Sequence, residues 1–323
     1  IPSDNLFDVL VVTDTVTRFT YDYAENQFSA QDEYSIDCAK VFSTTDGSGF
    51  YCLEEGTLSL IDFRSSNPLV ASVETEIITR NLQVLIDSNG NIVLASGVNY
   101  PVVVSLSASL KETNFSISLP GIRMDLTGME QMKDGSYILF GLSTHHAVSY
   151  LIISSDGQLM EEVIVESPLT AYIIPSGYNQ ACHCLYGNLL KPALVIIPLS
   201  SPEKSTMHTY SVLGNHQLET LKLELFSSGR TLFHLGEFFP TSPPPHPSVI
   251  LVTESDGSLV ESSAPVSVSS STISFTFKTL PIPELKQAVI KPTEMSPVYS
   301  IPCSNTGYST SAPPSHPMNP VPK

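Results

Sequence analysis

The chain has 323 residues, of which 41% are hydrophobic and 15% charged, a balance that excludes an intrinsically disordered protein. Its net charge of −17, from 15 Lys and Arg against 32 Asp and Glu, makes nucleic acid and anionic membrane surfaces poor partners. No apolar run approaches the roughly 18 residues that a membrane-spanning helix needs, so we expect no membrane insertion.

The start and the composition of the chain predict a secreted protein. The sequence begins Ile1-Pro2 rather than with Met, which is typical of a mature product after removal of a leader or propeptide, or of an excised fragment. Ser and Thr are abundant, Trp is absent and Lys is scarce. We therefore expect an extracellular or cell-surface location.

The first 34 residues predict three strands, at 7–12, 16–21 and 28–34. From residue 36 onward a unit recurs in which an apolar strand ends at a polar, Gly-containing turn and a second apolar strand follows at once. The expected turn glycines, 42 to 52 residues apart, are Gly47, Gly90, Gly135, Gly177 and Gly229. A period of this length with four short strands per unit is typical of β-propellers.

Each unit continues with a third apolar run and a more polar fourth segment. The third runs lie at 58–63, 102–106, 148–154, 193–199 and 249–252. Continuous rather than alternating apolar residues indicate strands that are covered on both faces. Five complete units fit between residues 36 and 265, and one further strand is expected at 269–278.

This strand and turn register resembles the WD-repeat pattern of β-propellers over most of residues 1–279. The Trp-Asp and Gly-His signatures are absent, so the resemblance implies an architecture and no functional residue. It predicts an all-β, six-bladed propeller in which the three N-terminal strands pair with 269–278 to close the ring. The alternative is a pair of β-sandwiches with coincidental turn spacing.

Residues 280–323 form the second expected unit, an extended tail. Ten of the 25 prolines lie in 281–323, and this segment cannot build a core of its own. Short motifs at 242–245 (SPPP) and 312–315 (APPS) resemble those of hydroxyproline-rich surface glycoproteins; a rigid unmodified linker is the alternative.

Cys38 and Cys52 lie on either side of the first turn, where an antiparallel hairpin places them nearly opposite one another. Cross-strand Cβ atoms are then close to disulfide geometry. We expect a disulfide between them, with two buried thiols as the alternative.

The run Cys182-His183-Cys184 invites a metal-site interpretation, because thiolate and imidazole are zinc ligands. On a strand, however, the two sulfurs point to one face and the imidazole to the other, so we expect no metal there. We expect no cofactor, and motifs of the common enzyme classes are absent, which makes catalysis less expected without excluding it. Asn114 begins an Asn-Phe-Ser sequon and is the predicted glycosylation site.

The functional prediction is a non-enzymatic extracellular structural or interaction protein. We expect self-association, in the extreme a filament, through the tail, since extended segments dock by strand addition. The expected assembly residues are Val289, Ile290, Val298, Tyr299, Ile301 and Cys303. The alternative is a glycan-binding or glycan-cleaving propeller with its site at the central channel.

Overall fold

The computed structural model describes residues 6–13, 15–22, 24–64, 68–77, 81–97, 100–143, 146–169, 172–189, 191–212, 218–226, 228–236, 248–283, 286–288, 290–292 and 300–302. Within these ranges the chain is all-β, with several antiparallel sheets and one short 3-10 turn, η1 (Pro202–Lys204). None of these residues belongs to a helix long and apolar enough to cross a membrane.

The N-terminal strands form one sheet, which we call sheet 1. It contains β1 (Leu6–Val12), β2 (Val16–Asp22) and β3 (Gln27–Tyr34), and its fourth strand is β27 (Ser300–Pro302). The three N-terminal strands confirm the prediction from sequence.

Five meanders of four strands follow. Sheet 2 contains β4 (Lys40–Ser43), β5 (Gly49–Glu54), β6 (Thr57–Asp62) and β7 (Leu69–Thr75). Sheet 3 contains β8 (Gln83–Ile86), β9 (Ile92–Ser96), β10 (Val102–Leu106) and β11 (Thr113–Ser118). Sheet 4 contains β12 (Met124–Gln131), β13 (Tyr137–Ser143), β14 (Val148–Ile153) and β15 (Leu159–Glu166).

Sheet 5 contains β16 (Ile174–Asn179), β17 (Cys184–Asn188), β18 (Ala193–Pro198) and β19 (Ser205–Val212). Sheet 6 contains β20 (Glu219–Leu225), β21 (Thr231–Gly236), β22 (Ser248–Thr253) and β23 (Leu259–Ser262). The five predicted third runs correspond to β6, β10, β14, β18 and β22, the third strand of each of these sheets.

Four of the five predicted turn glycines adopt the left-handed backbone that such a hairpin turn requires. They are Gly47, Gly90, Gly135 and Gly229, with φ between +65° and +86°. The prediction for Gly177 is wrong, because this glycine lies inside β16 at a bulge. The fourth turn spans 180–183 instead, and His183 takes the left-handed conformation with φ +51°.

Consecutive sheets pack face to face, and a buried apolar cluster fills each of the five interfaces. In β9, Ile92 and Leu94 face sheet 2 whereas Val93 and Ala95 face sheet 4. This two-sided burial explains why the inner strands have continuous apolar sequences. It also sets aside the arrangement as two β-sandwiches.

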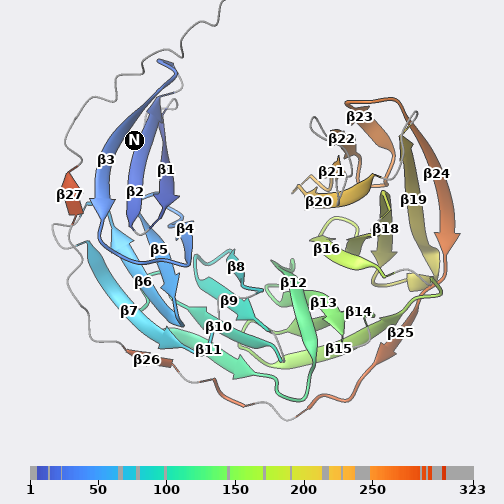
Figure 1. The fold of residues 1–323 in the computed structure, drawn as a ribbon. Helices are drawn as coiled ribbons and strands as arrows, with labels where there is room; N and C mark the ends of the chain where they lie inside the picture. Colours follow the sequence, from blue (N-terminus) through green and yellow to red (C-terminus); the bar gives the residue numbers. More distant parts are fainter. Residues whose placement is uncertain are drawn as a thin grey trace, which may run out of the picture.

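Figure 1 shows the sheets following an arc, with the first strand of each sheet toward the inside, and the two ends of the arc do not meet. Within the described residues no buried cluster joins sheet 1 to sheet 6. The predicted closure is wrong: residues 269–278 fall in two strands, β24 (Val266–Ile273) and β25 (Thr276–Thr279), which pair with β19 and β15. The chain leaving sheet 6 reaches the neighbouring edge of sheet 5 by a short connection, whereas sheet 1 lies at the far end of the arc.

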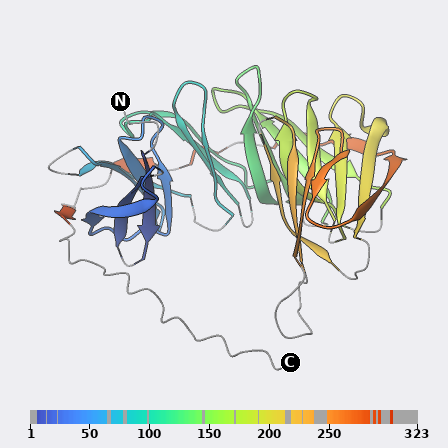
Figure 2. The ribbon, with the colours of Figure 1, turned by 90° about the horizontal axis from the view of Figure 1, so that it is seen from above.

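We call the described residues from Val266 to Pro302 the strap. After β24 and β25 it forms a bridge from Lys286 to Ser118 of β11, and then β26 (Ile290–Pro292) pairs with β7 and β27 with β3. Figure 2, seen from above, shows the blue sheet 1 at one end of the array and the strands of sheets 5 and 6 at the other. The strap therefore runs backwards along the outer edges of five sheets.

Candidate functional site

The predicted tail, 280–323, with its expected assembly residues, begins within the strap, and its described strands, β26 and β27, pair with sheets of the same chain. Ile290 is half-buried and packs against the cluster between sheets 2 and 3. Ile301 pairs with Glu33 of β3. Val289, Val298, Tyr299 and Cys303 lie outside the described residues.

The strap is held at β11 by both backbone and side-chain contacts. The Ser118 amide donates to the Lys286 carbonyl at 2.7 Å, and the Lys286 amide donates back at 3.1 Å. The Ser116 hydroxyl donates to the Ala288 carbonyl at 2.8 Å, and Ala288 is 4% exposed. Around residues 286–288 the tail is therefore part of the folded body.

Nearer its beginning, the strap contributes to the core. Ile273 and Phe275 are buried in the cluster between sheets 4 and 5. The ring of Phe277 packs edge-on against Tyr150 of β14, with centroids 5.7 Å apart. Burial of such side chains stabilises each by roughly 1.5–3 kcal/mol, so this part of the strap is the firmly anchored end.

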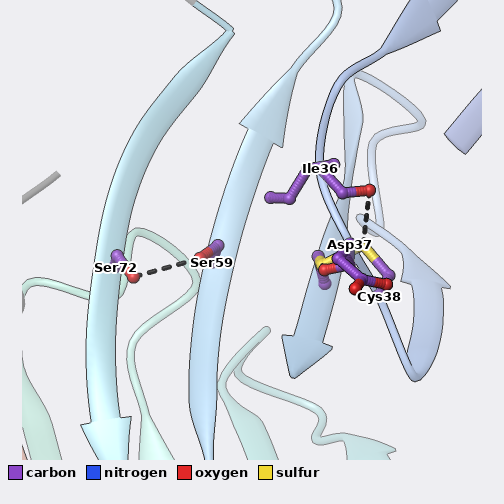
Figure 3. Close-up of a disulfide and its surroundings, with 6 residues drawn as sticks. Ile36, Asp37, Cys38, Ser59 and Ser72 are labelled. Carbon is purple, nitrogen blue, oxygen red and sulfur yellow. Dashed lines mark hydrogen bonds between the residues drawn. A yellow bond between two sulfur atoms is a disulfide. The ribbon is translucent and has the colours of Figure 1, made fainter. Parts of the chain in front are cut away.

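The disulfide between Cys38 and Cys52 is present, with Cα atoms 5.4 Å apart, and Figure 3 shows it beside Ile36 and Asp37. The register that led to the prediction is wrong in detail, because Cys52 pairs with Val41 in the ladder. Cys38 lies before β4, in a connection where the Ala39 amide donates to the Leu53 carbonyl at 3.0 Å. The bond joins this connection to β5 at the interface of sheets 1 and 2.

Asn114, the predicted glycosylation site, is exposed in β11, the outer strand of sheet 3. Its side-chain amide donates to the Ser105 hydroxyl at 3.1 Å. The sequon serine is Ser116, whose hydroxyl contacts the strap. Glycan attachment at Asn114 stays a prediction.

A pocket with a volume of about 380 Å³ lies between the turn that follows β12 and the turn that follows β16. These turns belong to the inner hairpins of sheets 4 and 5, which pack against one another. The pocket is lined by Met132, Lys133, Asp134, Tyr178, Gln180, Ala181, Cys182 and His183. Of these, sequence reasoning singled out only Cys182 and His183. The others come together because the turns at 132–135 and 180–183, far apart in sequence, meet at the sheet interface.

The polar groups of this pocket are pre-oriented. The Tyr178 hydroxyl and His183 Nδ1 are 2.6 Å apart and share a hydrogen bond. Burial, and next the charge of Asp134, raise the pKa of Tyr178 to about 12, so the phenol stays protonated. Hydrogen bonds from the Ser136 side chain and amide lower the pKa of Asp134, which is therefore an ionised acceptor at neutral pH.

Cys182 and Cys184 differ in environment. Cys182 is exposed in the turn, whereas Cys184 is buried at the start of β17. Burial, together with a hydrogen bond to Cys182, raises the pKa of the Cys184 thiol, which disfavours the thiolate that a metal needs. Among the described residues no group of three His, Cys, Asp or Glu side chains converges as a metal site would require.

No family model matches the chain, and no curated protein matches it in sequence. Among solved structures, the crystal structure of a protein of unknown function from Bacteroides caccae is similar over 81% of this chain and 94% of its own length. The identity is 12% and the TM-score 0.46. This comparison supports no activity, substrate or partner for the present chain.

Proposed function

We propose that this protein is a non-enzymatic extracellular structural and interaction protein. In this proposal its six sheets are propeller-type blades with a WD-like register, and copies self-associate through the C-terminal tail, in the extreme into a filament. The disulfide Cys38–Cys52 supports an oxidising compartment, because such bonds persist mainly in secreted and surface proteins.

The observation that carries the proposal is the way in which β27, in the predicted tail, pairs with sheet 1. β27 has three residues and completes sheet 1 by backbone pairing with β3. Backbone hydrogen bonds carry no side-chain identity, so the edge of β3 accepts the same strand from its own chain or from another copy. Exchange of an identical element between copies is a low-cost route to assembly.

The test compares the full chain with two truncations, after Pro292 and after Leu280, by size-exclusion chromatography with light scattering and by electron microscopy. The shorter truncation removes β27 with the residues that follow Pro292; the longer one also removes β26 and the Lys286 bridge but keeps β24 and β25. We expect oligomers or filaments from the full chain and monomers from both truncations, with a β-sheet circular dichroism spectrum in all three proteins. Association of both truncations to the same extent as the full chain would refute the role of the tail.

The pocket between the turns favours a second candidate, glycan binding. Its described lining offers an aromatic ring, Tyr178, with an amide, Gln180, and one carboxylate, Asp134, a mixture that suits a hydroxyl-rich ligand. Cleavage is less favoured, because glycosidases use a pair of carboxylates across the bond. Calorimetric titration with an oligosaccharide library, using Gln180→Ala as the weakened variant, tests this candidate; absence of any heat of binding would remove it.

A further inference from the structure

Among the residues that the structure describes, sheet 1 and sheet 6 each have one face that no other sheet covers. Within the described residues, sheets 2 to 5 are covered on both faces by buried clusters. In the same part of the chain, the only buried cluster on sheet 1 joins it to sheet 2, and the only one on sheet 6 joins it to sheet 5. The strand registers show which side chains occupy the two uncovered faces.

In sheet 1, Arg18 lies on the face that packs against sheet 2. Its guanidinium carbon is 4.2 Å from the ring centroid of Phe63, the residue that follows β6. Because side chains alternate along a strand, the neighbours of Arg18 in β2 and their cross-strand partners point away from sheet 2. Val11 is 42% and Phe28 61% exposed on this outward face. Its apolar residues are Val9, Val11, Phe19, Tyr21 and Phe28.

In sheet 6, Phe233 and Leu251 lie on the face that packs against sheet 5, and both are fully buried. The register pairs His234 with Ile250, so these two residues face the other way, and Ile250 is 47% exposed. The apolar residues of this outward face are Leu232, Ile250 and Val252. Both ends of the array therefore present exposed apolar side chains, which on sheet 6 lie beside the ion pair of Lys222 and Glu224 in β20.

The two uncovered faces have the same relation to one another as the two faces that meet at each internal interface. We call the face that a sheet turns toward the next sheet in the chain its forward face, and the opposite face its backward face. At each of the five internal interfaces, the forward face of one sheet packs on the backward face of the next. Sheet 6 retains a free forward face and sheet 1 a free backward face. A contact between them continues the internal stacking, is heterologous, and leaves one free face at each end of any open assembly.

A second copy fits these faces better than the other end of the same chain. The two ends of the arc do not meet in Figure 1. Closing the ring within one chain would require all five packed interfaces to shift, and close-packed cores resist such deformation. The strap, paired with the outer edges of five sheets, opposes the same movement, whereas a second copy requires none of these changes.

We infer that sheet 6 of one copy stacks on sheet 1 of the next through the faces centred on Ile250 and Phe28. This inference rests on the proposed self-association and adds to the tail a contact between the bodies. Assembly then depends on both contacts, because each increases the effective concentration of the other.

The test uses full-length chains with a lysine in one face. Phe28→Lys alters sheet 1, Ile250→Lys alters sheet 6, and Met160→Lys is the control at a side chain that is 57% exposed in β15 of sheet 4. All three changes reduce the net negative charge equally, so general repulsion does not explain a difference. We expect each face variant alone to need an about tenfold or more higher concentration to assemble, and the control to assemble as the unaltered chain does.

The decisive measurement is an equimolar mixture of the two face variants. Each retains one intact face of the opposite kind, so the mixture should yield one-to-one dimers that do not grow, seen by light scattering. Monomers in the mixture, as ring closure within one chain would produce, overturn the inference, and so does unimpaired assembly of either variant alone. If the face variants assemble normally while the chain truncated after Leu280 does not, the tail proposal stands and the face inference fails; the reverse result keeps the faces and removes the tail.

Discussion

Asp87 connects two neighbouring sheets through one carboxylate. It lies in the turn between β8 and β9 and is 6% exposed. Its Oδ1 accepts the amides of Asn89 and Asn91, each at 2.8 Å, and its Oδ2 accepts the hydroxyl of Tyr137 of sheet 4 at 2.9 Å. Burial alone would raise the pKa of Asp87, but the hydrogen bonds from Asn91, Tyr137 and Asn89 outweigh it, and the pKa is lowered.

We expect Asp87→Asn to lower the free energy of unfolding by about 1–3 kcal/mol at pH 7, because the amide nitrogen cannot accept the hydrogen bonds. A carboxyl group whose pKa is lowered by folding contributes stability above its unfolded pKa, about 3.9, and loses it as the pH falls through the folded value. The difference between the two proteins should therefore shrink below about pH 4. Urea unfolding at pH 7 and pH 3 measures it, with Asp256→Asn in an exposed turn as the control; an equal effect of both variants would contradict the argument.

The disulfide between Cys38 and Cys52 should contribute to the free energy of unfolding. Cys38 and Cys52 are 14 residues apart, and removing a cross-link that closes a loop of this size costs about 3 kcal/mol in the chain-entropy model. The double variant with Cys38→Ser and Cys52→Ser should show this loss in urea unfolding. Mass spectrometry of unreduced peptides should show the two residues joined; a bond from either one to Cys182, Cys184 or Cys303 would refute the assignment.

At the scale of the strand pair, the hairpin of β12 and β13 allows no side chain at Gly141. A Cβ atom there would lie 2.1 Å from the Asp125 carbonyl oxygen. In the neighbouring strand Ser149 pairs with Gly141 and is 4% exposed, and its hydroxyl has no hydrogen-bond partner among the described residues.

Gly141→Ala should therefore lower the free energy of unfolding by about 1–3 kcal/mol, the range seen when a packed core is overfilled. The matched control, Ser149→Ala in the same pair of strands, should be neutral or stabilising because it removes an unpaired buried hydroxyl. Thermal unfolding followed by circular dichroism compares them. Equal midpoints for the two variants would show that the backbone yields at this point without cost.

In the described part of the chain, the six sheets form an open arc in which the buried apolar clusters join each sheet to its neighbours and, in places, to the strap. In such arrays stability is close to a sum of local terms, so end units open before central ones. As far as the chain is described, sheet 1 and sheet 6 have one neighbouring sheet each, whereas sheets 3 and 4 have two.

At concentrations that keep the chain monomeric, hydrogen exchange measured by mass spectrometry should therefore be slowest in β9, β10, β13 and β14. It should be faster in β1, β2 and β20 to β23, whose sheets are covered on one face. Uniform protection across all six sheets would instead indicate a closed ring. The measurement also shows whether β26 and β27 exchange faster than β24 and β25, as their shorter ladders predict.

The local architecture can be predicted from the amino-acid sequence. The strand positions, the succession of four-stranded meanders and the burial of their third strands follow from apolar periodicity and turn chemistry, which act over a few residues. The turn at His183 was not predicted, because a residue other than glycine adopts the left-handed conformation there. Gly177 lies instead at a bulge in β16.

The pairing of the C-terminal segment and the identity of the uncovered surfaces depend on how the sheets pack, and the sequence does not predict them. Edge pairing uses backbone groups common to every residue, so residues 269–278 carry no pattern that selects β19 and β15 rather than the N-terminal strands. The pocket beside Tyr178 likewise depends on the packing of sheets 4 and 5. The exposure of Phe28 and Ile250 depends on the arc staying open, since in a closed ring the same alternating strands would bury them.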